Sequence, residues 1–120
     1  MDEKIKHFRD LRVWQKGIEI VKEIYRITNH YPKVENYGLS SQMRRSAISI
    51  PSNRTEGFKR FHNKEFRQFL FIASGSAAEL ETQLFISKEL KYIDENEYGQ
   101  LIEKIDHLCR MLSQLITKLI

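Results

Sequence analysis

The chain has 120 residues, which is the length of one domain and enough to bury a hydrophobic core without disulfides. Its 41% hydrophobic and 30% charged residues exclude general disorder, and no apolar run reaches the ~18 residues that a membrane-spanning helix needs. Because it has one cysteine, Cys109, and a charged start unlike a signal peptide, we expect a cytoplasmic protein without an intramolecular disulfide.

The first predicted helix covers about residues 10–30, and strand alternation is nearly absent from the whole chain. Its apolar residues form two adjacent stripes at helical spacing, one of Trp14, Ile18, Val21, Tyr25 and Thr28 and the other of Val13, Gly17, Ile20, Ile24 and Ile27. We expect Trp14 to anchor the core. Pro32 ends this segment, since a proline disfavours helix at the residue before it, and a short linker ends at Gly38.

The second predicted helix covers about residues 39–61. One face carries the apolar and small residues Met43, Ala47, Ile50, Gly57 and Phe61. Pro51 lies in the middle, where it removes a backbone hydrogen bond and crowds the carbonyl of Ala47, at ~3 kcal/mol if nothing relieves it. The spacing therefore allows either a helix that restarts at Pro51 or one that continues with a kink.

The third and fourth predicted helices cover about residues 64–90 and 95–119. Asn63 is a plausible N-cap for the third, and Asp94 with Glu97 has the spacing of a capping box that starts the fourth. The core stripes predicted for these helices are Phe66, Leu70, Ala73, Ala77, Leu80 and Leu84 on the third and Tyr98, Leu101, Ile105, Leu108, Leu112, Leu115 and Leu119 on the fourth.

Four helices of ~30–40 Å joined by short connections predict a single all-α domain over residues 1–120, an antiparallel up-down-up-down four-helix bundle. The third helix also carries apolar residues outside its core stripe. We favour an oligomer interface there, made by Phe71, Ile72, Phe85 and Ile86. Scattered exposed hydrophobic residues, which are normal on protein surfaces, are the alternative.

Positive charge is concentrated in residues 44–67, where seven cations and two carboxylates give +5 in a chain whose net charge is +4. Such a patch is what a polyanion needs, and the predicted nucleic-acid-binding residues are Arg44, Arg45, Arg54, Lys59, Arg60, Lys64 and Arg67. A solvated charged face is the alternative, and ion pairing is as good an explanation for Arg44 and Arg45. The phenylalanines near the patch could stack on unpaired bases, but their spacing fits core and interface better; they are Phe58, Phe61, Phe66, Phe69 and Phe71.

Polar residues on the second and third helices form a predicted structural cluster of Ser49, Ser52, Asn53, Glu56, Ser76 and Glu79. A catalytic serine needs a base, and no histidine is adjacent in sequence, so easing of the proline bend and bonding between helices explain the cluster better. Glu103 and His107 have the spacing of a metal pair but lack a third ligand in the pattern. We therefore expect no enzyme activity, no metal and no cofactor.

Three segments, FRDLRVWQKGIEIV, YGLSSQMRRSAISIPSN and KEFRQFLFIASGSAAELETQL, resemble the four-helix-bundle family of 23S rRNA-intervening sequence proteins. That family is similar to the accessory protein of diversity-generating retroelements. The resemblance is colinear over about residues 8–119. It implies a bundle that assembles into a pentameric ring and a helix that bends at Pro51.

The family has no established activity among its intervening-sequence members, whereas the retroelement accessory protein binds nucleic acid and a reverse transcriptase through a basic surface. The chain departs from the family at Arg54, where an apolar residue is common; that charge must reach water or a carboxylate such as Glu56, Glu79 or Glu81. Our leading hypothesis is a non-enzymatic homopentamer that binds RNA or DNA. The alternatives are a scaffold for a polymerase or ribosomal component and, less favoured, an enzyme at Ser52 and Glu56.

Overall fold

The computed structural model describes residues 2–120, with side chains described from Leu11 onward. Its elements are α1 (Asp2–Thr28), the 3-10 helix η1 (Lys33–Tyr37), α2 (Leu39–Phe58), α3 (Asn63–Glu89) and α4 (Glu95–Lys118), with no strand in that range. The four predicted helices are confirmed. Two ends differ from the prediction, since α1 begins at Asp2 and α2 ends at Phe58.

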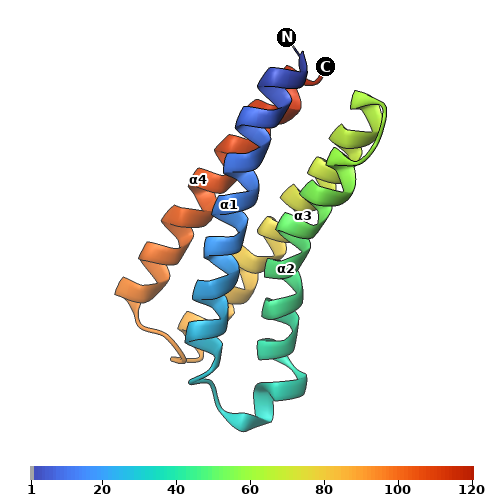
Figure 1. Cartoon of the computed structure of the whole chain (residues 1–120). Coiled ribbons are helices and arrows are strands. Elements are labelled where there is room, and N and C mark those ends of the chain that lie inside the picture. The colour runs from blue at the N-terminus through green and yellow to red at the C-terminus, as the bar shows by residue number, and fades with distance from the viewer. Residues whose placement is uncertain (1) are drawn as a thin grey trace.

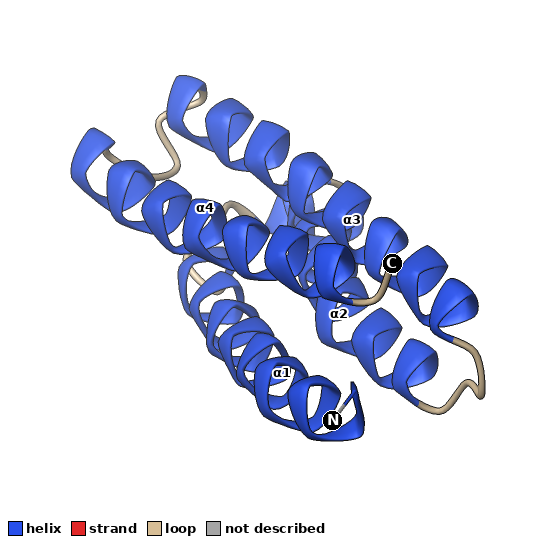
Figure 2. Ribbon diagram, turned by 90° about the horizontal axis from the view of Figure 1, so that it is seen from above, coloured by secondary structure: helices blue, strands red, loops and turns tan. Residues whose placement is uncertain are grey.

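The four helices form an antiparallel bundle in which each helix packs on its neighbours in sequence and α4 packs back on α1 (Figures 1 and 2). The bundle is elongated, with extents of 48 × 26 × 18 Å. Figure 1 shows both chain ends and the α2–α3 loop at one end of the bundle, and η1 with the α3–α4 loop at the other. No helix among the described residues is long and apolar enough to cross a membrane.

The predicted core stripes of α3 and α4 are buried as expected. All six α3 residues are 0% exposed, and the α4 stripe is buried from Leu101 to Leu119, with Tyr98 half-buried at its start. Cys109 is half-buried and packs against this core. Unbroken heptad spacing therefore predicted the inward faces of the second half of the chain.

The two stripes of α1 have different environments. Val13, Ile20 and Ile24 face the core and are at most 1% exposed. In the neighbouring stripe Trp14 is only half-buried and Tyr25 is 42% exposed. The prediction of Trp14 as a core anchor is wrong, because the stripe beginning at Val13 is the one turned toward the bundle axis.

Helix α2 runs through Pro51, so the alternative of a restart there is excluded. Pro51 is buried against α1 at Gly17, where an added Cβ would lie 3.3 Å from the ring carbons of the proline. Gly17 therefore lets α1 pass close to the one residue of α2 that cannot donate a backbone hydrogen bond.

The helix ends around α2 and α3 correct two predictions. Phe61, predicted on the core face of α2, lies beyond the end of that helix and is 98% exposed. Asn63 is the first residue of α3 rather than its N-cap, which is His62 without a side-chain bond. The predicted cap of α4 is confirmed, because Asp94 accepts a hydrogen bond from the Glu97 backbone N–H at 2.8 Å.

Candidate nucleic-acid interface

The hairpin of α2, its loop and α3 carries the predicted basic residues, and four of them project into solvent. Arg45 lies on α2, Lys59 and Arg60 follow the end of that helix, and Lys64 lies in the first turn of α3. Among the side chains from Leu11 onward, no ion pair joins Arg45, Lys59 or Lys64 to a carboxylate. These three charges are therefore available to an anionic partner.

Arg60 is partly engaged within the hairpin. Its guanidinium lies 3.9 Å from the Glu56 carboxylate and 4.9 Å from the centroid of the Phe69 ring. An exposed i,i+4 pair of this length is weak, because both groups remain hydrated. The aromatic ring holds the guanidinium against α3 and leaves its outer face open to solvent.

Arg44 takes a structural position between α1 and α2. Its Nε donates to the Thr28 hydroxyl at 2.9 Å, and its guanidinium lies 4.7 Å from the Tyr25 ring centroid. The Thr28 hydroxyl in turn donates to the Ile24 carbonyl at 2.6 Å. The half-buried Arg44 side chain thus joins α2 to α1 through a hydroxyl and an aromatic ring, and not through an ion pair with any described carboxylate.

Arg54 and Arg67 are also half-buried. The Arg54 guanidinium lies 4.8 Å from the Phe58 ring centroid, with one nitrogen 3.4 Å from the Thr55 hydroxyl. Arg67 donates to the Leu119 carbonyl at 2.6 Å, so its positive charge lies at the carboxyl end of α4, where the helix dipole favours a cation. The predicted basic set therefore divides into four exposed residues and three half-buried ones, of which Arg44 binds α1, Arg67 binds the end of α4 and Arg54 contacts residues of α2.

The predicted polar cluster divides in the same way. Ser76 on α3 donates to the Ser49 hydroxyl on α2 at 2.7 Å, and the Asn53 amide donates to the Ser49 carbonyl and hydroxyl at 2.8 Å each. This group joins α2 to α3 next to Pro51. Ser52 and Glu79 are exposed and lie outside it.

Ser52 and Glu56 instead line an open groove of about 430 Å³ between α1 and α2. Its remaining lining is mostly apolar, with Trp14, Ile18, Val21, Ile48, Pro51 and Thr55. Among the groove residues that the structure describes, there is no histidine, cysteine or lysine that could activate the Ser52 hydroxyl. Its chemistry is that of a contact surface.

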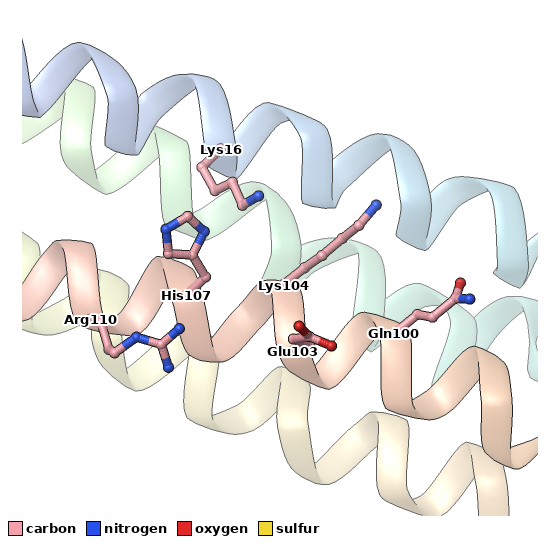
Figure 3. Close-up of a pocket in the computed structure, with 6 residues that line it drawn as sticks. All are labelled: Lys16, Gln100, Glu103, Lys104, His107 and Arg110. Atoms are coloured by element: carbon pink, nitrogen blue, oxygen red, sulfur yellow. The ribbon is translucent and has the colours of Figure 1, made fainter.

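A second open pocket, of about 470 Å³, lies between α1 and α4. Figure 3 shows Lys16 reaching in from α1, while the other lining residues, Gln100, Glu103, Lys104, His107 and Arg110, project from α4. Lys104 and Lys16 share the Glu19 carboxylate at 3.5 and 3.9 Å. Among the described residues, no third His, Cys, Asp or Glu joins the Glu103–His107 pair as a metal ligand.

The four apolar residues of α3 that were predicted to form an oligomer interface are exposed in the single chain. Phe71 is 58% exposed, Ile72 51%, Phe85 47% and Ile86 41%. Phe85 also packs edge-on against Tyr98 of α4 at 6.2 Å, so it is the most engaged of the four within the chain. The others present apolar surface that the single chain leaves in contact with water.

Comparison with known proteins places this bundle in a family. The sequence model of one family, described as 23S rRNA-intervening sequence protein, matches residues 9–114. The chain belongs to the 23S rRNA-intervening sequence protein family. No curated protein is detectably similar to it. Among solved structures, it is similar to a protein of unknown function from the S23 ribosomal protein family of Bacteroides thetaiotaomicron, with 26% identity, a TM-score of 0.78, and coverage of 91% of this chain and 98% of the other.

The residues that carry the family resemblance lie mostly where helices meet in this 23S rRNA-intervening sequence protein. Ser49 and Asn53 join α2 to α3, and Pro51 packs on α1. Gly57 lies where a Cβ would come 2.7 Å from Phe66 and 2.8 Å from Phe69. Most of the shared motif therefore describes the packing of the bundle. Of the exposed cations, Arg45 lies within the motif on α2, whereas Lys59, Arg60 and Lys64 lie at the loop that follows it.

The sequence pattern predicted Phe61 on the packing face of α2. In the structure Phe61 lies instead in the middle of the exposed basic loop. A signal for this was present. Residues 59–64, KRFHNK, interrupt the apolar spacing on both sides of Phe61 with charged and polar residues. Without apolar residues at helical spacing around Phe61, the segment has no apolar face to pack on the core, so the sequence gives no support for helix there.

Proposed function

We propose that this protein is a non-enzymatic, cytoplasmic homo-oligomer that binds RNA or DNA through the phosphate backbone. The observation that carries the proposal is the group of exposed cations Arg45, Lys59 and Lys64, which have no carboxylate partner among the described side chains, with Arg60 beside them. A surface of this kind gains affinity by releasing the counterions of a polyanion, without reading its sequence.

Assembly would strengthen such binding. The family resemblance implies five copies in a ring, with α2 bent at Pro51, and the exposed Phe71, Ile72 and Ile86 on α3 supply apolar surface for the contact. A closed ring needs two different complementary patches on each copy. The apolar groove between α1 and α2 is the second patch we propose. A ring would then repeat the basic loop and raise avidity for a long polyanion.

The test compares two triple charge reversals. The first replaces Arg45, Lys59 and Lys64 by glutamate. The control replaces the exposed Lys22, Lys33 and Lys91 by glutamate, which changes the net charge equally at other places on the surface. Affinity for RNA and DNA oligonucleotides is measured by fluorescence anisotropy over a range of salt concentrations.

We expect the first variant to lose at least ~10-fold in affinity, and the slope of log K against log salt to flatten by ~0.7–0.9 for each phosphate that the protein no longer neutralises. The control should keep most of its affinity, since the reversed charges lie on α1, on η1 and in the α3–α4 loop, away from the α2–α3 loop. Equal losses in both variants would mean that net charge alone attracts the polyanion. Absence of binding to any nucleic acid at low salt would reject the proposal.

The groove lined by Trp14, Ile18 and Ile48 favours a second candidate, a scaffold that holds a protein such as a polymerase or ribosomal component. Co-purification of a partner that survives nuclease treatment, together with normal behaviour of the Arg45, Lys59 and Lys64 variant, would favour the scaffold over nucleic-acid binding.

A further inference from the structure

The loop of residues 59–62 presents an aromatic ring that the bundle does not use. Phe61 is 98% exposed at the end of the α2–α3 hairpin, which diverges from α1 and α4 toward this loop in Figure 1. The neighbouring phenylalanines are engaged within the chain. Phe58 and Phe66 pack edge-to-face at 6.2 Å, and Phe69 lies under the Arg60 guanidinium. Phe61 therefore differs from the aromatic residues around it.

The surroundings of Phe61 are cationic and polar. Lys59 and Arg60 precede it, Lys64 follows three residues later, and no Asp or Glu occurs between Gly57 and Lys64. The ring is thus flanked on both sides of the loop by exposed ammonium groups that have no carboxylate partner among the described side chains. A planar ring between cations is the arrangement by which proteins hold single strands, with bases stacked on the ring and phosphates near the charges.

We propose that the α2–α3 loop binds single-stranded nucleic acid by stacking an unpaired base on Phe61, while Lys59 and Lys64 contact the phosphates on either side. This inference rests on the proposed function and deepens it, because it names the substrate class. Paired bases cannot reach the ring without leaving their duplex, so binding favours single strands, loops and ends over duplexes.

An anionic membrane surface is the competing occupant of a loop with an aromatic residue and cations. The loop offers a single apolar side chain between Lys59 and Lys64, so insertion would bury little surface beyond one ring. Stacking needs no more than one face of that ring. The observations therefore favour a base over a lipid.

The test replaces Phe61 by alanine and, separately, by tryptophan. The matched control is Tyr37→Ala, since Tyr37 is 99% exposed in η1 at the opposite end of the bundle. Each variant is titrated with single-stranded oligo(U) and with an RNA duplex of equal length at one salt concentration. A Trp14→Phe background makes the tryptophan introduced by Phe61→Trp the sole one in the chain, so that stacking is seen as fluorescence quenching.

We expect Phe61→Ala to lose ~5- to 100-fold in affinity for the single strand and to keep its affinity for the duplex. Phe61→Trp should bind the single strand at least as well as the natural protein, with quenched fluorescence, and Tyr37→Ala should behave as the natural protein does.

Unchanged single-strand affinity in Phe61→Ala, with binding still abolished by reversal of Arg45, Lys59 and Lys64, would overturn stacking and leave backbone binding intact. Failure of the natural protein to bind any nucleic acid would overturn both. Two further results for Phe61→Ala would also reject the inference. If the variant lost binding to phosphatidylserine vesicles but not to nucleic acid, the ring would be a membrane contact, and if its oligomer mass changed, the ring would be part of an interface between copies.

Discussion

Arg44 and Arg45 are adjacent in the chain, yet their side chains have different surroundings. Arg44 reaches the Thr28 hydroxyl and the face of Tyr25, whereas Arg45 is exposed. A step of one residue turns a helix by about 100°, so neighbours face different parts of the molecule. Composition alone therefore overstates the size of a binding surface, because some of its charges bind within the fold.

Glu35 makes the clearest single-residue contribution at the η1 end of the bundle. One carboxylate oxygen accepts from the Leu39 backbone N–H at 3.0 Å, and the other accepts from the Tyr92 hydroxyl at 2.8 Å. The Tyr92 ring also packs on Tyr31, with centroids 5.0 Å apart. These bonds to the charged carboxylate, first from the Leu39 backbone and then from Tyr92, lower the pKa of Glu35.

Replacing Glu35 by alanine should lower the free energy of unfolding at neutral pH. Because the pKa of Glu35 is lower in the folded state, its stabilisation is present above the unfolded pKa, ~4.3, and is lost as pH falls through the folded pKa. The difference between the two proteins should therefore narrow in acid. Urea unfolding at a series of pH values measures it.

Tyr92→Phe is the matched control for Glu35, because it removes the hydroxyl and keeps the ring against Tyr31. It should show a smaller loss with the same dependence on pH. A Glu35→Ala deficit that stays constant down to acid pH would contradict the linkage and leave only a packing effect.

At the scale of elements, α2 makes close contacts with both α1 and α3 through glycines. Gly17 of α1 gives room for Pro51, and Gly57 lies against Phe66 and Phe69 of α3. The bonds from the Asn53 amide to Ser49 span the turn of α2 that contains Pro51. Small residues at both crossings let the backbones approach, which explains how a helix with an internal proline remains part of a close-packed bundle.

Gly57→Ala tests this packing. The added methyl carbon would lie 2.7 Å from a ring carbon of Phe66, which is 0% exposed, and 2.8 Å from the Cβ of Phe69. We expect a net loss of ~1–2 kcal/mol in the free energy of unfolding, since overpacking outweighs the better helix propensity of alanine. Urea denaturation at one protein concentration measures it.

Gly75→Ala is the control within α3, because an added Cβ there meets nothing within 4 Å. It should raise the stability of the chain by ~0.5–1 kcal/mol through helix propensity alone. Equal responses of the two glycines would show that α2 and α3 can separate at Gly57 without cost, contrary to a close-packed crossing at that residue.

At the scale of the whole molecule, the bundle leaves apolar surface on two of its sides. Phe71, Ile72 and Ile86 lie on α3, and the groove with Trp14 and Ile48 lies between α1 and α2. A single chain of 14.3 kDa buries its main core completely, so these residues are in excess of what one bundle needs. The association of copies that we propose would remove them from water.

The double variant Ile72→Glu, Ile86→Glu should dissociate the oligomer while leaving the helix content of each chain unchanged, since both side chains are exposed in the single bundle. Light scattering after gel filtration measures the mass. Val34→Glu is the control, because Val34 is 81% exposed on η1. A natural protein that already runs as a single 14.3 kDa chain would remove the basis of the proposed ring.

The sequence by itself determined the four helices, the buried faces of α3 and α4 and the cap at Asp94, because each depends on spacing within one helix. It also showed that the excess positive charge lies in residues 44–67, since the positions of Lys, Arg, Asp and Glu can be read directly from the sequence.

Tertiary structure decided which stripe of α1 faces the core and which arginines are exposed. It also decided that Phe61 lies in the exposed α2–α3 loop and not in the core. These outcomes depend on what a neighbouring helix offers at each position: a carbonyl at Leu119, a hydroxyl at Thr28, or nothing beyond the end of α2. Periodicity along one helix carries no information about those partners, because they come from distant parts of the chain.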